Sequence, residues 1–203
     1  MDKKTATILK KAKKIKMLIT DVDGVLTDAT MNFFATPSGK IAEVKKFCAY
    51  DGLACHMLRD GGIKSAIITG GNAPATEARA ASLGMDFLYY NFLSKGIALK
   101  NLLKKSGLKA EEVAYIGDDF IDMPAMLEAG LACAVKTSIP EVKKIAHYIT
   151  KKEGGKGAFR EVAELLLYRW EYTSSRRPSV WRRLRERRIS FWSLLRIMIS
   201  ATR

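Results

Sequence analysis

IKMLITDVDGVLTD, at residues 15–28, is a short apolar run that ends in two aspartates two positions apart. Its bounded apolar part, residues 16–19, predicts a buried parallel strand. Asp21 and Asp23 follow at the C-terminal end, and their spacing places both side chains on one side of an extended chain. Gly24 then allows a sharp turn and a close approach to the backbone. Two carboxylates this close need a cation, a shared proton or solvent, although an ordinary acidic turn is the simpler alternative.

Length and composition indicate one well-buried domain. The chain has 203 residues, of which 48% are hydrophobic, and it contains no apolar stretch of the roughly 20 residues that a membrane span requires. We also expect no secretory signal, because the apolar run after the Lys-rich residues 1–14 is short and ends in aspartates. Cys48, Cys55 and Cys133 lack metal-ligand spacing. They are typical of reduced thiols in a cytoplasmic protein.

The net charge of +14 is unevenly distributed, which suggests a domain boundary. Residues 1–167 hold 22 Lys and three Arg against 19 acidic residues. Residues 168–203 hold ten Arg, no Lys and two Glu. We therefore predict a globular domain at 1–167 and an Arg-rich C-terminal extension at 168–203.

Strand and helix patterns alternate along the domain and predict its fold. We expect strands at 16–19, 63–69, 87–90, 113–116 and 131–135, with a short edge strand at 148–149. We expect helices at 5–14 (or a frayed arm), 51–60, 74–83, 94–105, 124–129, 139–146 and 158–167. Residues 31–34 and 41–44 flank a turn and predict an inserted β-hairpin. This alternation is typical of an α/β fold, a Rossmann-like doubly wound parallel sheet covered on both faces.

Polar residues follow four of the predicted strands, and in a parallel sheet these strand ends meet at one rim. The group consists of Asp21, Asp23, Thr69, Gly70, Lys95, Asp118, Asp119 and Asp122. Each member has a simpler explanation: Thr69 could cap a helix, Lys95 could be solvated, and the last three aspartates could be an acidic helix start. All of them together, each at a strand end, make those explanations improbable.

Phosphoryl transfer through an aspartyl phosphate is the chemistry that fits this group. Asp21 could attack phosphorus, and Asp23 could protonate the leaving oxygen and then deprotonate water. Three converging aspartates suit Mg²⁺, which keeps several waters and binds substrate phosphate oxygens. Thr69, the Gly70 amide and Lys95 could hold the oxygens of the phosphate that do not react.

The stretches DVDGVLTD, IITG, Lys95 and GDDFID resemble, in order, the four motifs of the haloacid dehalogenase superfamily of phosphatases. The resemblance covers residues 15–167 and is strongest to the cap-less 3-deoxy-D-manno-octulosonate (KDO) 8-phosphate phosphatases, which also share the hairpin and GGKGAFREV at 154–162. It implies that Asp21 is the nucleophile and Asp23 the general acid/base. It implies Mg²⁺ ligands from Asp21, the Asp23 carbonyl and Asp118, with Asp119 and Asp122 in support. It also implies a role in lipopolysaccharide biosynthesis.

Spacing independently predicts that no cap domain is present. Asp21 and Thr69 are 48 positions apart, and Thr69 and Lys95 are 26 apart. Predicted elements already fill both gaps, so neither has room for a lid. A bare pocket would be open to water. The resemblance implies that neighbouring subunits close it in a homotetramer.

Two departures from the family pattern lie on the substrate side. Gly71 stands where the family usually has Arg after Thr-Gly, and the stretch at 51–54, Asp-Gly-Leu-Ala, lacks its second Gly. Arg79 matches a family Arg, and with Lys156 or Arg160 it could bind a substrate carboxylate, although surface ion pairing would explain these residues equally well. Asp51 is a further substrate-binding candidate. A sialic-acid-type 9-phosphate or a broader range of sugar phosphates is therefore the alternative substrate class.

The Arg-rich extension has no counterpart in the resemblance. Apolar residues in it recur near helical spacing, namely Trp181, Leu184, Phe191, Leu195 and Met198. That pattern suits a basic amphipathic helix on an anionic membrane surface or in a partner groove. Disorder, or appended sequence unrelated to the fold, is the alternative. We expect no nucleic-acid partner, because no recognition fold accompanies the arginines. A non-catalytic membrane- or partner-binding module is the most distant alternative function.

Overall fold

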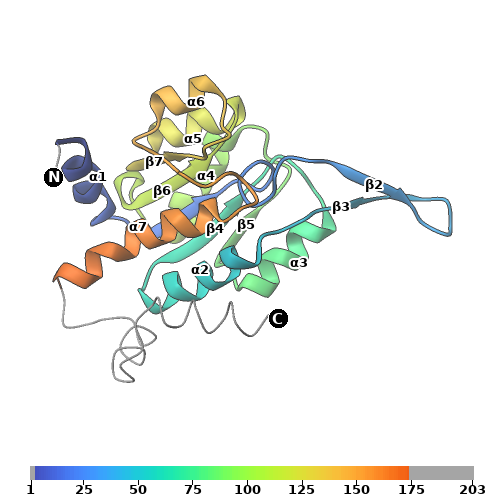
Figure 1. The fold of residues 1–203 in the computed structure, drawn as a ribbon, viewed down its shortest axis with the longest axis horizontal. Helices are drawn as coiled ribbons and strands as arrows, with labels where there is room; N and C mark the ends of the chain where they lie inside the picture. Colours follow the sequence, from blue (N-terminus) through green and yellow to red (C-terminus); the bar gives the residue numbers. More distant parts are fainter. Residues whose placement is uncertain (1–2, 174–203) are drawn as a thin grey trace.

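A six-stranded parallel sheet forms the centre of the computed structural model, which describes residues 3–173 and the side chains of residues 3–167 (Figure 1). The strand order is β5-β4-β1-β6-β7-β8. These strands are β1 (Met17–Thr20), β4 (Lys64–Ile68), β5 (Phe87–Tyr89), β6 (Val113–Gly117), β7 (Leu131–Ala134) and β8 (Tyr148–Ile149). β1 lies between β4 and β6, with Thr20 level with both Ile67 and Ile116. The loops after these three strands therefore lie side by side.

Helices cover both faces of the sheet, as the doubly wound prediction requires. One face packs against α1 (Lys3–Ala12), α2 (Ala49–Asp60), α3 (Pro74–Leu83) and α7 (Ala158–Thr173). The other packs against α4 (Lys95–Ser106), α5 (Met123–Glu128) and α6 (Pro140–Ile145). Successive side chains of β1 alternate between the two faces of the sheet. Leu18 points into the first core, and Met17 and Ile19 point into the second. Short 3₁₀ turns, η1 (Ala110–Glu112) and η2 (Phe120–Asp122), flank β6.

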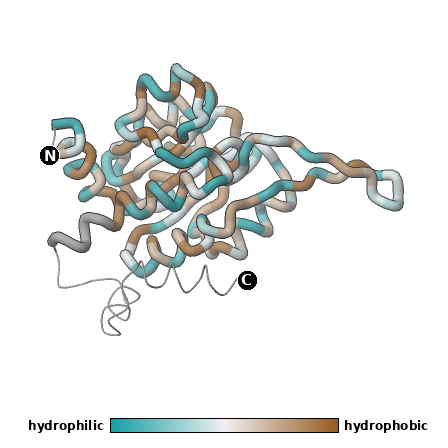
Figure 2. Tube along the Cα trace, viewed as in Figure 1, coloured by the Kyte–Doolittle hydropathy of each residue, from teal (hydrophilic) through white to brown (hydrophobic). Residues whose placement is uncertain are grey.

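The predicted hairpin is present and forms a separate two-stranded sheet. β2 (Asn32–Ala35) pairs antiparallel with β3 (Ile41–Val44), and both project away from the main body (Figure 1). Figure 2 shows hydrophobic residues along both arms of this projection. Within residues 3–173 no further domain covers the sheet rim, which confirms the prediction of a fold without a cap.

Four helix ends differ from the predictions by two residues or more. α1 begins at Lys3 and ends at Ala12 rather than spanning 5–14, α2 begins at Ala49 rather than Asp51, and α7 runs to Thr173 rather than to about Leu167. α7 thus crosses the composition change at Tyr168 without a break. The amphipathic helix predicted further on lies outside the described residues. No helix among those described is both long and apolar enough to cross a membrane.

Candidate active site

Lys95 is fully buried between two carboxylates, so the solvated alternative does not apply. Its Nζ lies 2.8 Å from Asp21 Oδ1 and 2.7 Å from Asp122 Oδ1. Burial acts to lower the pKa of Lys95, but the two carboxylates outweigh it and raise that pKa above its ordinary value. Lys95 therefore carries a positive charge at the C-terminal end of β1.

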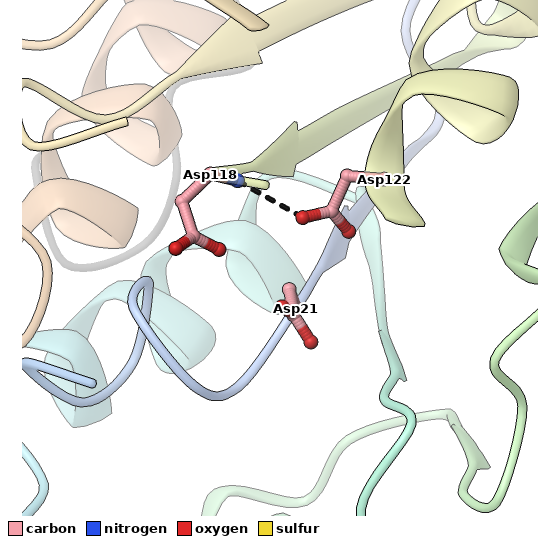
Figure 3. A group of neighbouring side chains, drawn as sticks. All are labelled: Asp21, Asp118 and Asp122. Atoms are coloured by element: carbon pink, nitrogen blue, oxygen red, sulfur yellow. Dashed lines mark hydrogen bonds between the residues drawn. The ribbon is translucent and has the colours of Figure 1, made fainter. Parts of the chain in front are cut away.

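Asp122 is a buried hub rather than a free carboxylate. Besides Lys95 it accepts hydrogen bonds from the Tyr115 hydroxyl at 2.8 Å and from the backbone amides of Asp118 and Asp119 at 3.0 and 3.2 Å. Figure 3 shows the bond from the Asp118 amide. Asp119 is exposed and caps η2 by accepting from the Phe120 amide. Asp119 is thus an acidic residue at a helix start, whereas Asp122 binds Lys95 and the backbone amides of Asp118 and Asp119.

Asp118 completes a cluster with Asp21 and Asp122, whose nearest oxygens lie within 4.8 Å of one another (Figure 3). The close approach predicted at Gly24 makes room for it, because a Cβ on Gly24 would stand 2.0 Å from Asp118 Oδ2. Asp118 Oδ1 is buried and has no hydrogen-bond partner among the described residues. An orphaned carboxylate oxygen beside a second carboxylate is the donor set that Mg²⁺ prefers. The residues present therefore fit a magnesium ion.

Both carboxylates that face this position bind protons more tightly than usual. Burial, together with the nearby Asp122, raises the pKa of Asp21 to about 7. Burial, together with Asp21 and Asp122, raises the pKa of Asp118 to about 8. The ordinary pKa of an aspartate is 3.8, so between pH 4 and 8 the folded metal-free protein binds more protons than the unfolded chain.

We therefore expect the metal-free protein to lose stability as the pH rises from about 4 to about 8, because both carboxylates must then ionise in a buried site. Mg²⁺ should restore stability mainly at the upper end, where the carboxylates can bind it without first losing protons. Thermal unfolding at pH 5.5 and 8.5, each with EDTA or Mg²⁺, measures this. Asp118→Asn should flatten the pH dependence. A midpoint that responds to neither pH nor Mg²⁺ would contradict this prediction.

Asp23 lies at the edge of the cluster, and its side chain is 44% exposed. Its Oδ1 accepts from Lys45 Nζ at 2.5 Å and from Thr27 Oγ1 at 3.4 Å. Lys45 and Tyr115 were not singled out in the sequence. Lys45 gives no local signal, because it follows β3 as one of two consecutive lysines. Tyr115 offers none either, since it sits inside an apolar strand.

Thr69 is buried at the end of β4, and it does not cap α3, whose N-cap is Ala73. Its Oγ1 accepts from the Gly71 amide at 3.3 Å. A Cβ on Gly71 would lie 3.7 Å from Asp23 Oδ2 and 3.8 Å from Thr69 Oγ1. The loop of residues 69–71, which includes Gly70, therefore borders Asp23. Side chains longer than glycine would fit at position 71, since these distances are ordinary van der Waals contacts.

The four substrate-binding candidates bond to residues outside this cluster. Asp51 is buried, and its Oδ1 accepts from the Arg160 amide at 2.9 Å, which holds α2 to the start of α7. Burial raises the pKa of Asp51 to about 6. Arg79 donates to the Cys48 carbonyl at 2.9 Å, and Lys156 pairs with Glu153 at 2.7 Å. The Arg160 side chain pairs with Glu164 at 2.6 Å. Within the described residues, none of the four bonds to Asp21, Asp23 or Asp118.

Comparison with known proteins matches these features to a family. Residues 85–161 match the model of the haloacid dehalogenase-like hydrolases. A 3-deoxy-D-manno-octulosonate 8-phosphate phosphatase of Escherichia coli is 42% identical over 163 residues, which are 80% of this chain and 85% of that protein. The chain belongs to this phosphatase family. The enzyme of the same name from Haemophilus influenzae is 39% identical over 157 residues, 77% of this chain and 85% of that protein.

Solved structures of the family share the fold. The phosphatase from Yersinia pestis superposes with a TM-score of 0.76 at 39% identity, over 81% of this chain and 87% of that one. The phosphatase from Moraxella catarrhalis, solved with a magnesium ion, a phosphate ion and a KDO molecule, gives a TM-score of 0.75 at 39% identity, over 81% and 92%. The fold and family predicted from the motifs are thereby confirmed.

Proposed function

We propose that this protein is a Mg²⁺-dependent phosphatase that hydrolyses 3-deoxy-D-manno-octulosonate 8-phosphate to the free sugar acid and phosphate. The observation that carries the proposal is the buried Lys95 bridging Asp21 and Asp122, beside the unpartnered Asp118 oxygen. The family relatives carry that activity in their names, and one of them binds magnesium, phosphate and KDO.

The proposed reaction proceeds in two halves. Asp21 attacks phosphorus and forms an aspartyl phosphate, while the bond from phosphorus to the sugar oxygen breaks and its electron pair moves to that oxygen. Asp23 gives the leaving oxygen a proton. The resulting Asp23 carboxylate then takes a proton from a water that attacks the aspartyl phosphate, which regenerates Asp21 and releases phosphate.

The remaining residues of the cluster hold the phosphoryl group and the metal. Thr69, the Gly70 amide and Lys95 would bind oxygens that do not react. Asp21, Asp118 and the backbone carbonyl of Asp23 would hold Mg²⁺. When bound, the ion offsets the repulsion between the anionic nucleophile and the anionic substrate.

Asp119 and Asp122 support this arrangement. Asp119 caps the turn η2 that carries Asp122. Asp122 fixes the Lys95 ammonium and the backbone amide of Asp118. Each of these contacts orients a group that the reaction uses, so both aspartates act through their neighbours.

The leaving sugar acid would be bound outside this cluster. Arg79 and Arg160, with Lys156, are the cationic candidates for its carboxylate, and Asp51 tethers the α7 end that carries Arg160. Gly71 stands where the family usually has Arg, and a side chain at this position could be accommodated in contact with Asp23. The alternative substrates, a sialic-acid-type 9-phosphate or a broader range of sugar phosphates, depend on these same positions.

Phosphate release from a panel of sugar phosphates tests the substrate. We expect the largest kcat/KM for 3-deoxy-D-manno-octulosonate 8-phosphate, by about tenfold or more over neutral hexose phosphates, since the neutral sugars lack the carboxylate. All activity should disappear with EDTA and return with Mg²⁺. Equal rates across the panel would favour the broad phosphatase. A higher value for the sialic-acid-type 9-phosphate would reassign the substrate.

We also propose a cytoplasmic homotetramer that serves lipopolysaccharide biosynthesis. Exposed apolar side chains support the assembly, because they cover both arms of the hairpin where no described residue buries them, and they are Met31, Phe33, Phe34, Ile41 and Val44. A hairpin of this kind is stable when it packs against another surface. Packing between hairpins would bring neighbouring subunits over each other's sheet rims. The three free cysteines are consistent with a reducing compartment.

Replacing Phe33 with Thr should weaken this assembly. Threonine keeps the strand propensity but removes an apolar side chain whose burial stabilises by about 1.5–3 kcal/mol. Subunit dissociation constants should therefore rise by about tenfold or more, measured by light scattering after size exclusion. Ile97→Thr, at an exposed apolar position on α4, is the matched control and should leave the tetramer intact. A variant at Phe33 that assembles like the unmodified protein would contradict the prediction.

A further inference from the structure

Lys45 lies just after β3, at the root of the projecting hairpin, yet its side chain is only 6% exposed. Two carboxylates meet its ammonium: Asp23 Oδ1 at 2.5 Å and Glu43 Oε1 at 2.9 Å. A lysine is rarely buried without such pairing. Because β2 and β3 form a sheet of their own, this ion pair ties the hairpin to the loop after β1.

The two oxygens of Asp23 have different surroundings. Lys45 and Thr27 both donate to Oδ1. In the part of the chain that the structure describes, Oδ2 receives no hydrogen bond. It lies 3.7 Å from the Cβ position of Gly71, a point that is itself 3.8 Å from Thr69 Oγ1. Oδ2 is thus the oxygen on the side of the loop that would bind phosphate.

We propose that Lys45 is a positioning residue that holds Asp23 Oδ1, so that Oδ2 faces the reacting phosphoryl group. The inference rests on the proposed function, in which Asp23 transfers the proton. As Asp21 bonds to phosphorus, the proton on Asp23 Oδ2 passes to the sugar oxygen that leaves with the electron pair of the broken bond. In the second half the same oxygen takes a proton from the attacking water.

Direct substrate binding by Lys45 fits the geometry less well. The ammonium is nearly shielded from solvent, and two carboxylates already contact it. A role limited to anchoring the hairpin would use the same contact with Asp23, since Glu43 lies within the hairpin itself. Anchoring alone predicts equal losses on different leaving groups, whereas positioning of the proton donor predicts unequal losses. General acid catalysis depends on holding the proton donor within hydrogen-bond reach of the leaving atom, and a second donor on Oδ1 achieves this.

The test compares two leaving groups in Lys45→Met, Lys45→Arg and the control Glu43→Gln. The sugar-acid phosphate leaves as an alkoxide that needs a proton, whereas para-nitrophenyl phosphate leaves as a stable anion. For Lys45→Met we expect kcat on the sugar phosphate to fall about 10²-fold, with KM changed by less than about threefold. The loss on para-nitrophenyl phosphate should stay below about tenfold. Lys45→Arg should recover most of the rate, and Glu43→Gln should stay near the unmodified enzyme.

A double variant checks that Lys45 acts through Asp23. Adding Lys45→Met to Asp23→Asn should lower kcat by no more than about twofold further, because the group that Lys45 positions is already lost. Circular dichroism monitors folding, and Lys45→Gln takes the place of Lys45→Met if that variant does not fold.

Three outcomes would overturn the inference: equal losses on both substrates, a raised KM with unchanged kcat, or additive losses in the double variant. Failure of the proposed function would look different. The unmodified enzyme would then not hydrolyse the sugar-acid phosphate, and Lys45 would be tested on an alkyl phosphate that it does hydrolyse.

Discussion

Asp21→Asn should abolish Mg²⁺-dependent phosphate release, with kcat falling by about 10⁴-fold or more. An amide oxygen cannot attack phosphorus as a carboxylate does, and no other described carboxylate takes its place beside Lys95. Asp122, the second partner of Lys95, is buried and already accepts four hydrogen bonds. The loss should be similar on the sugar-acid phosphate and on para-nitrophenyl phosphate, because both need the nucleophile.

Stability separates this loss from simple unfolding. Burial raises the pKa of Asp21 to about 7, so at pH 8 the carboxylate ionises at a cost that asparagine avoids. The metal-free variant should therefore be at least as stable as the unmodified protein at pH 8. Asp28→Asn is the matched control, since Asp28 lies in the same loop with an exposed carboxylate that accepts from the Thr30 amide. Retained Mg²⁺-dependent turnover in Asp21→Asn would show that the mechanism is wrong.

The position of the site could be predicted because it follows from the topology of the sheet. A polar residue directly after a buried strand must lie at the C-terminal rim, and adjacent parallel strands bring such residues together. Asp21, Thr69 and Asp118 each follow a strand that was predicted within about one residue of its observed end. Lys95 could be predicted only from the order of the motifs. Its neighbours in the sequence do not show that its side chain is buried.

Contacts between distant segments could not be predicted in the same way. Lys45 reaches Asp23 only because the hairpin root folds back over the loop after β1. The sequence does not show which of the two consecutive lysines, Lys45 or Lys46, has the buried side chain. Tyr115 resembles a core residue in sequence, although its hydroxyl bonds to Asp122. The early start of α2 at Ala49 likewise lacks a local signal, because its N-cap Cys48 makes no side-chain capping bond.

Lys95→Met should lower both activity and stability, and the second effect should depend on pH. Removing one partner of a buried ion pair leaves uncompensated charge and costs about 3–5 kcal/mol of unfolding free energy. Here Asp21 and Asp122 both lose the ammonium, while Asp118 stands close by. The phosphoryl group loses a cation as well, so kcat should fall by about 10²–10³-fold. Arginine at this position would keep the charge but overfill a fully buried site, so Lys95→Arg should recover little.

The pH dependence identifies the cause. Burial raises the pKa of Asp21 to about 7 and of Asp118 to about 8, so both carboxylates take up protons as the pH falls below those values. Protonation removes the repulsion that Lys95 normally offsets, and the destabilisation should therefore be smaller at pH 5.5 than at pH 8.5. Lys100→Met is the control: Lys100 lies on the same helix, 68% exposed, 3.2 Å from Glu128. Exposed pairs of this kind contribute about 0–1 kcal/mol, so its unfolding free energy should barely change. If Lys95→Met lost the same stability at both pH values, lost packing rather than unpaired charge would be the reason, and Lys95 would not be the cation on which the three aspartates depend.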